Sequence, residues 1–407
     1  MQPTVNPTQP PPTSAPGRGA YVPQFGRTVA AVGVPTSVLI LAGIATALAL
    51  SFDVVANPVL ATIGIVLSGA ACGVVVLCYL WLDRWEPEPP RLLLFAWLWG
   101  GVAAVIALIT SLADTDFFVS TVIRAPIVEE LAKGSFLVIM ATGVRRRELN
   151  TLIDCLVYAG LVGASFGFIE NVLYLARGED IYGTIGVAIV RLATPFLHPL
   201  FTSLTAIGLY IGLRRPGTYA WLGFMALGCL GAILLHMVWN STSLLVHFVL
   251  FVPLFGGAVA LALVARHREQ KVLLAQLPGL VGIGLVTPPE AAWLSTLSGR
   301  RRWAAEAEEL AGKQARQAVG TFAGAVTELA FARDRFAHGG GSRELAERHA
   351  ELVSVILGLV RPPVPPWPAP LHPDLGGQPW PISGLVPVGG GPLSPGDAFW
   401  NPIPGPP

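Results

Sequence analysis

Two adjacent glutamates, Glu129 and Glu130, stand with Lys133 inside an otherwise apolar segment of this chain. Residues three and four apart share one face of a helix, so Lys133 can lie against either carboxylate. Neighbouring carboxylates in a medium of low dielectric constant do not both ionise easily, which favours proton exchange at one of them. Such a pair can supply a general base that activates water.

Three further apolar segments carry polar side chains of related kinds. These are Phe166, Glu170 and Asn171 in "SFGFIEN", His198 in "PFLHPLFT", and His236 and Asn240 in "HMVWN". Positions 166 and 170, and positions 236 and 240, are four apart, so each pair can share one helix face. An imidazole or amide can steady an oxyanion, and two carboxylates with two imidazoles also suit a divalent metal. No HExxH motif is present, so the residues alone leave a metal open.

The composition places these residues in a membrane protein. The 407 residues are 53% hydrophobic and only 13% charged, with a mean hydropathy of +0.61. Soluble domains carry roughly 25% charged residues, so that class is excluded. Apolar blocks long enough to cross a bilayer predict an all-α, polytopic bundle of about eight spans. The spans are 28–50, 57–82, 92–112, 121–143, 151–176, 186–212, 219–241 and 243–265.

The connecting loops predict the orientation, because Lys and Arg stay on the cytoplasmic side. One set of alternate loops holds Arg18, Arg27, Arg84, Arg91, Arg145, Arg146, Arg147, Arg214, Arg215, Arg266, Arg268 and Lys271. The other set holds only Arg177. Both termini are therefore expected in the cytoplasm of a multi-pass cell-membrane protein. A net charge of +1 says nothing about a nucleic-acid partner, and no basic cluster with interleaved aromatics suggests one, so none is expected.

The regions outside the spans have different compositions. Residues 1–27 form a Pro-rich arm and residues 361–407 a Pro/Gly-rich tail, and both compositions predict disorder. Residues 28–265 form the membrane domain. Residues 266–360 predict a cytoplasmic helical region, with a "GGGS" break before its last helix. The part of the chain after the membrane domain is either a small helical cytoplasmic appendage of unknown use or, through its tail, a Pro-rich ligand for a partner domain.

The predicted depths bring the polar residues together. With this orientation Glu129 and Glu130 lie roughly 12–14 Å below the outer surface, Glu170 roughly 9 Å and His198 roughly 18 Å. Asp154 starts its span and is expected at the cytoplasmic end. Pro195 and Pro199 flank His198 and predict a break in that helix. We therefore expect a wet polar cavity in the outer half of the bilayer.

The residues leave several functions open. A hydrolase and a proton-coupled transporter, with the carboxylates as a proton relay, explain the cavity equally well. A membrane scaffold is a third alternative. Taken singly, the Glu–Lys pair is also explained as a neutralised structural pair, and His236, Asn171 and Asn240 as hydrogen bonds between helices.

The motifs together resemble the PrsW family of intramembrane proteases. "EELAK", "SFGFIEN", His198 and "HMVWN" occur there in the same order, and "LDRWEPEPPRLLLFAWLWGG" resembles the loop before the core helices. The resemblance covers about 82–265. It implies relation to the CAAX prenyl endopeptidases and bacteriocin-processing enzymes, whose FxxxH pattern is FxxxE here, at Glu170.

The resemblance also implies roles for the site residues. Glu129 or Glu130 would activate water, His198 and His236 would be catalytic or metal-binding, and Asn240 would hold the oxyanion. Lys133 is the basic partner of the first motif, with Phe166 and Asn171 supporting. A divalent ion such as zinc would be held by Glu129, His198 and His236. The implied substrates are membrane-anchored proteins of the anti-sigma-factor kind, cut near the extracytoplasmic side.

Overall fold

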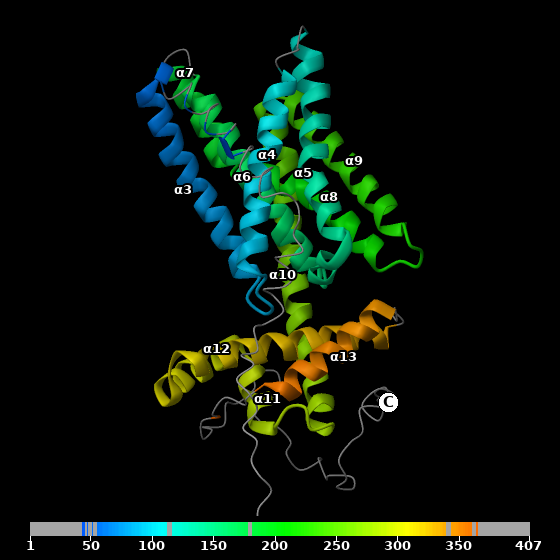
Figure 1. The fold of residues 1–407 in the computed structure, drawn as a ribbon. Helices are drawn as coiled ribbons and strands as arrows, with labels where there is room; N and C mark the ends of the chain where they lie inside the picture. Colours follow the sequence, from blue (N-terminus) through cyan, green and yellow to red (C-terminus); the bar gives the residue numbers. More distant parts are fainter. Residues whose placement is uncertain are drawn as a thin grey trace, which may run out of the picture.

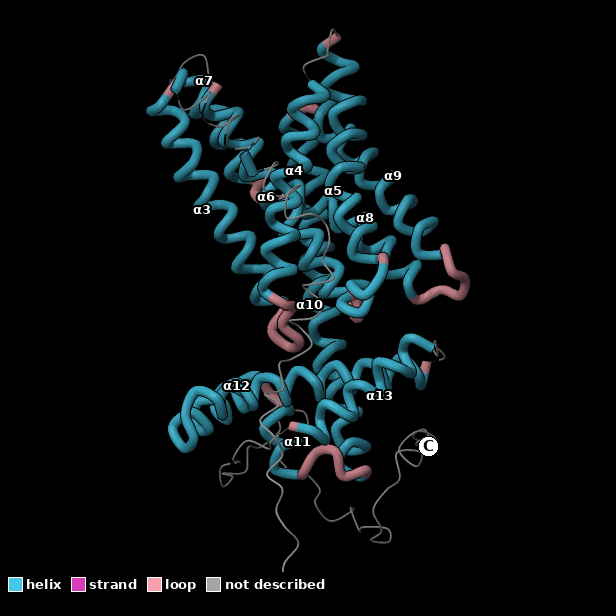
Figure 2. Tube along the Cα trace, viewed as in Figure 1, coloured by secondary structure: helices cyan, strands magenta, loops and turns pink. Residues whose placement is uncertain are grey.

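The computed structural model describes residues 55–111, 116–177, 181–338 and 343–359, together with positions 43, 44, 47, 51 and 364. The regular structure in these ranges is helical throughout, as Figures 1 and 2 show. The predicted arm 1–27 and nearly all of the predicted first span, 28–50, lie outside the described residues. So does the predicted tail, apart from position 364.

Within the described ranges, five helices are long and apolar enough to cross a membrane. They are α3 (Pro58–Leu82), α4 (Pro90–Ser111), α6 (Leu152–Ala176), α9 (Ala220–Ser241) and α10 (Leu244–Gly282). The first four match predicted spans to within a few residues. The polytopic helical bundle expected from the sequence is confirmed.

The predicted span 121–143 begins differently from a plain helix. A π-helical segment, η1 (Val119–Arg124), leads directly into α5 (Ala125–Ala141). Pro126 stands near the start of α5 and has no N–H to donate, so the regular ladder cannot run through this point. π-Helical turns free backbone groups and recur at functional sites.

The predicted break at His198 is confirmed. The span 186–212 divides into α7 (Ile181–Ala193) and α8 (Leu197–Leu213), with residues 194–196 between them. The Leu197 N–H donates to the carbonyl of Thr194 and closes the turn at 3.1 Å. His198 consequently lies in the first turn of α8, inside the membrane domain.

Helix α6 is the most buried of the long apolar helices. Two glycines, Gly100 of α4 and Gly163 of α6, allow α4 and α8 to approach its backbone closely. A Cβ added at Gly100 of α4 would lie 2.3 Å from the carbonyl oxygen of Val162. A Cβ added at Gly163 would lie 2.5 Å from the backbone nitrogen of Pro199. The first turn of α8, which carries His198, therefore packs directly on the backbone of α6.

This packing predicts that Gly163→Ala displaces the first turn of α8 and lowers the activity of any site built on His198 at least about tenfold, since small misplacements of site groups are costly. Gly73→Ala in α3 is the matched control, because a Cβ there meets nothing within 4 Å. The activity of the site and thermal unfolding in detergent are to be measured for both variants. Equal activity in the two would contradict the packing argument.

The C-terminal helices form a second apolar core at one end of the bundle (Figure 1). Helix α10 runs without interruption through the predicted boundary at 265 and leads to α11 (Pro288–Leu294), α12 (Leu297–Ala337) and α13 (Arg343–Gly358). Trp85, from the loop between α3 and α4, packs into this core. Arg300 of α12 donates to the Trp85 carbonyl at 2.8 Å, which fastens the C-terminal helices to that loop.

Asp154 lies in the first turn of α6, at the end of the span where the sequence predicted it, and caps the helix. It forms a capping box with Thr151. One carboxylate oxygen each from Asp83, Glu88 and Asp154 lie within 4.8 Å of one another. Burial raises the pKa of Asp83 to about 8, the hydrogen bond from the Glu88 N–H opposes this shift, and the Asp154 charge contributes to it. These acids belong to the end of the bundle that carries the C-terminal helices, well away from His198.

Candidate active site

The buried face of α5 carries the carboxylate pair. Glu129, Glu130 and Lys133 are all buried, and Lys133 has no exposed surface. The Lys133 Nζ donates to Oε1 of Glu130 at 2.6 Å and lies 3.8 Å from Oε2 of Glu129. It also lies 4.2 Å from the ring centroid of Phe166 on α6. The lysine therefore contacts both carboxylates and ties α5 to α6.

His236, on α9, is oriented by Glu130. Its Nδ1 lies 2.9 Å from Oε1 of Glu130, and its Nε2 lies 4.0 Å from Oε2 of Glu129. Glu130 is paired with Lys133 and so accepts hydrogen bonds, which assigns the ring proton of His236 to Nδ1. The Phe201 ring stacks on the imidazole at 4.6 Å. The Nε2 lone pair therefore points to the side where Glu129 lies.

His198, at the start of α8, is held from both sides. Its Nδ1 lies 3.2 Å from the Lys133 Nζ, and its Nε2 lies 2.6 Å from Oε2 of Glu170. An ammonium group can only donate, so Nδ1 is the acceptor and Nε2 carries the proton that Glu170 accepts. Arg191 of α7 pairs with Glu170 at 3.0 Å and donates to Oδ1 of Asn171 at 3.1 Å. Lys133 thus links the two histidine networks.

Asn240, which was expected to hold an oxyanion, makes a hydrogen bond to the backbone of another helix in the structure. Its Nδ2 donates to the backbone carbonyl of Thr121 at 2.9 Å. Thr121 belongs to η1, where the π-helical backbone alters the usual hydrogen-bond ladder. An amide nitrogen has two N–H groups, so Asn240 ties α9 to η1 and can still donate one hydrogen bond.

A polar cavity of about 160 Å³ lies among these helices. Glu170 and Asn171 of α6, Arg191 of α7, His198 of α8, and His236 and Asn240 of α9 line it. Gly167 of α6 also lines it, and a Cβ at that position would lie 3.0 Å from the His198 ring. The acids and imidazoles predicted from separate spans therefore converge on one site.

Comparison with known proteins identifies this domain. Residues 88–266 match the family model of the PrsW family intramembrane metalloproteases. Residues 88–266 thus form a PrsW-type domain. The match contains all of the polar residues that line this site and stops within α10, before the C-terminal helices. The resemblance seen in the motifs is confirmed, and the domain is that of a peptidase. Searches of curated proteins and of solved structures give no match.

A metalloprotease of the PrsW family requires a metal ion, and the residues present fit one. One ligand atom each from Glu129, His198 and His236 lie within 4.8 Å of one another. Oε2 of Glu129 and Oε2 of Glu130 are buried and have no hydrogen-bond partner among the described residues. An unpaired buried acceptor costs about 1–3 kcal/mol, which a cation beside it would offset. Two histidines and a glutamate are also a ligand set that catalytic zinc uses.

The hydrogen bonds to the two imidazoles decide which ring nitrogens remain for a metal. Glu130 holds Nδ1 of His236 and Lys133 holds Nδ1 of His198, which leaves Nε2 of each ring. Carboxylates that fix the tautomer of a ligating histidine are common in zinc enzymes. Nε2 of His198 now donates to Glu170, so coordination there would replace that hydrogen bond.

Some parts of the site were not assigned by sequence reasoning. Arg191 is the partner of Glu170, and its position as a lone cation in an apolar segment was the available signal. Trp239 and His247 line the polar cavity as well. Neither carries a pattern that distinguishes it from an ordinary aromatic or polar residue at a helix end.

Proposed function

We propose that the chain is an intramembrane endopeptidase that hydrolyses a peptide bond of a membrane-anchored protein near the extracytoplasmic side. The observation that carries this proposal is the meeting of Glu129, His198 and His236 at a buried carboxylate oxygen of Glu129 that accepts no hydrogen bond among the described residues. The loop charges support a chain with both termini in the cytoplasm of a cell membrane. By resemblance, the substrate is of the anti-sigma-factor kind.

The site residues have distinct roles in this proposal. Glu129, His198 and His236 would hold a zinc ion, which when bound lowers the pKa of water and polarises a carbonyl group. Glu130 fixes the tautomer of His236, and its Oε2, which accepts no hydrogen bond among the described residues, would accept the proton of the attacking water. That proton then passes to the leaving amine. The second N–H of Asn240 is the donor proposed for the oxyanion.

The family match favours a peptidase over the proton-coupled transporter that the residues alone left open. Lys133 and Arg191 also neutralise carboxylates that a proton relay would need to titrate. The buried charges are thus arranged to orient imidazoles.

The test is a cleavage assay with purified full-length protein and single-span reporter proteins in liposomes. We expect zinc-dependent cleavage, with the cut bond mapped by mass spectrometry to the extracytoplasmic third of the reporter span. A chelator should abolish cleavage and added zinc should restore it. Cleavage that is insensitive to chelation would overturn the metal assignment. Proton-linked flux without any cleavage would overturn the peptidase proposal.

A further inference from the structure

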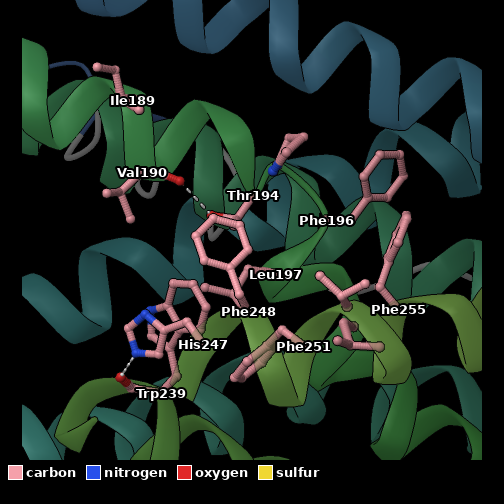
Figure 3. A pocket seen from close by; sticks show the side chains of 13 residues that line it. Ile189, Val190, Thr194, Phe196, Leu197, Trp239, His247, Phe248, Phe251 and Phe255 are labelled. Atoms are coloured by element: carbon pink, nitrogen blue, oxygen red, sulfur yellow. Dashed lines mark hydrogen bonds between the residues drawn. The ribbon is translucent and has the colours of Figure 1, made fainter. Parts of the chain in front are cut away.

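A second cavity, of about 260 Å³, lies beside the polar one and is lined almost wholly by apolar side chains (Figure 3). It forms where the break between α7 and α8 faces the first turns of α10. Phe196 and Leu200 stand on the α8 side, and Phe248, Phe251 and Phe255 on the α10 side. Its volume is below the roughly 300–1,000 Å³ of clefts that take drug-sized ligands, so it suits a side chain.

The two cavities share a wall. Val190, Thr194, Pro195, Leu197, Trp239 and His247 line both of them. The rings of Trp239 and His247 stack at 3.8 Å, and Nε2 of His247 donates to the Trp239 carbonyl at 2.7 Å (Figure 3). A group in the apolar cavity is therefore separated from the polar cavity by one layer of side chains. In a peptidase, a specificity pocket lies next to the site of the reacting bond in the same way.

The apolar cavity opens toward the outside of the bundle. Phe251 is buried and anchors α10 against Phe201 and Ala232. Its neighbour Val252 is 62% exposed, and Ile189 across the cavity is 65% exposed. In a bilayer this side faces lipid, and a membrane-anchored substrate arrives by the same route. A charged side chain would enter at high cost, because nothing in the apolar lining replaces its hydration.

We propose that this cavity is the specificity pocket of the peptidase and receives a large apolar side chain, such as Phe or Leu, beside the cut bond. The inference rests on the proposed function and adds the substrate class to it. Continuity with the polar cavity is what selects a substrate side chain over a lipid chain as the occupant.

The test uses full-length protein and two sets of single-span reporters. In one set the residue directly before the cut bond is varied, and in the other the residue directly after it. The varied residue is Ala, Leu, Phe or Asp. Filling a hydrophobic pocket changes selectivity by roughly 10- to 200-fold, so wild type should prefer Phe or Leu to Ala at one position by such a factor. Val252→Trp fills the cavity and should reduce this preference at least about tenfold.

Two further variants keep the test decisive. Val264→Trp lies on the same helix at a similar exposure, 65%, outside the cavity lining, and should keep the wild-type preference. Leu200→Ala enlarges the cavity and should extend cleavage to a reporter with Trp at that position. If Val252→Trp slows all reporters equally, or leaves the preference unchanged, a lipid or another segment fills the cavity and the inference is wrong. If wild type cuts no reporter, the proposed function itself fails.

Discussion

Glu129→Gln is expected to lower the cleavage rate by at least about 10³-fold while leaving the protein folded, as removal of a central catalytic group does in other proteases. The substitution keeps the size of the side chain and removes the charge that a divalent ion needs. Glu129 makes no hydrogen bond through Oε2 among the described residues, so little folded-state bonding is lost there. Initial rates on a reporter that wild type cuts would measure the effect.

Glu130→Gln should behave differently, because Glu130 is proposed to orient His236 and to accept the water proton rather than to bind the metal. Loss of an orienting carboxylate typically costs 10- to 100-fold in metal affinity, and loss of a general base costs about 10²- to 10⁴-fold in rate. Zinc titrations of Glu130→Gln should therefore show weaker binding that still saturates, with a low cleavage rate at saturating zinc, whereas Glu129→Gln loses a proposed ligand and should bind zinc more weakly still. Glu308→Gln, on α12 and outside the family match, is the control. Wild-type rates in Glu129→Gln, Glu130→Gln and His236→Ala together would show that the site is assigned wrongly.

Much of this site was predictable from the sequence, because burying charged residues in a membrane span costs free energy. Charged residues inside apolar spans are expensive, so Glu129, Glu130 and Lys133 stood out without any structure. The helix break at His198 followed from the flanking prolines, which cannot donate a backbone hydrogen bond. The capping role of Asp154 agrees with its predicted place at a helix start. These predictions needed only the properties of single helices, namely the polarity of their residues, their prolines and their caps.

Contacts between helices were not predictable in the same way. Spacing allowed Lys133 to pair with either glutamate, and only the packing of α8 against α6 brings it to His198. The hydrogen bond from Asn240 to Thr121 is accepted by a backbone carbonyl, which every residue has, so the sequence could not identify this partner. The carboxylates at positions 83, 88 and 154 look like ordinary loop and cap residues until the fold gathers them. The apolar cavity likewise depends on the relative placement of α7, α8 and α10.

Lys133→Met is the second substitution with a large expected effect, and it acts on stability as well as activity. It leaves Glu130 buried without its ammonium partner and removes the donor to Nδ1 of His198. Breaking one side of a buried ion pair typically costs about 3–5 kcal/mol, because the remaining charge is uncompensated. Unfolding in detergent, followed by circular dichroism, would measure the loss.

The double variant Lys133→Met with Glu130→Gln separates the two effects. It removes both charges, so most of the lost stability should return, since neutral replacements of buried pairs are often well tolerated. Activity should stay low, because neither His198 nor His236 is then held in its tautomer. Arg302→Met breaks an exposed pair with Glu306 and should change stability by less than about 1 kcal/mol. A Lys133→Met protein as stable as wild type would show that the lysine is not the counter-charge on which this site depends.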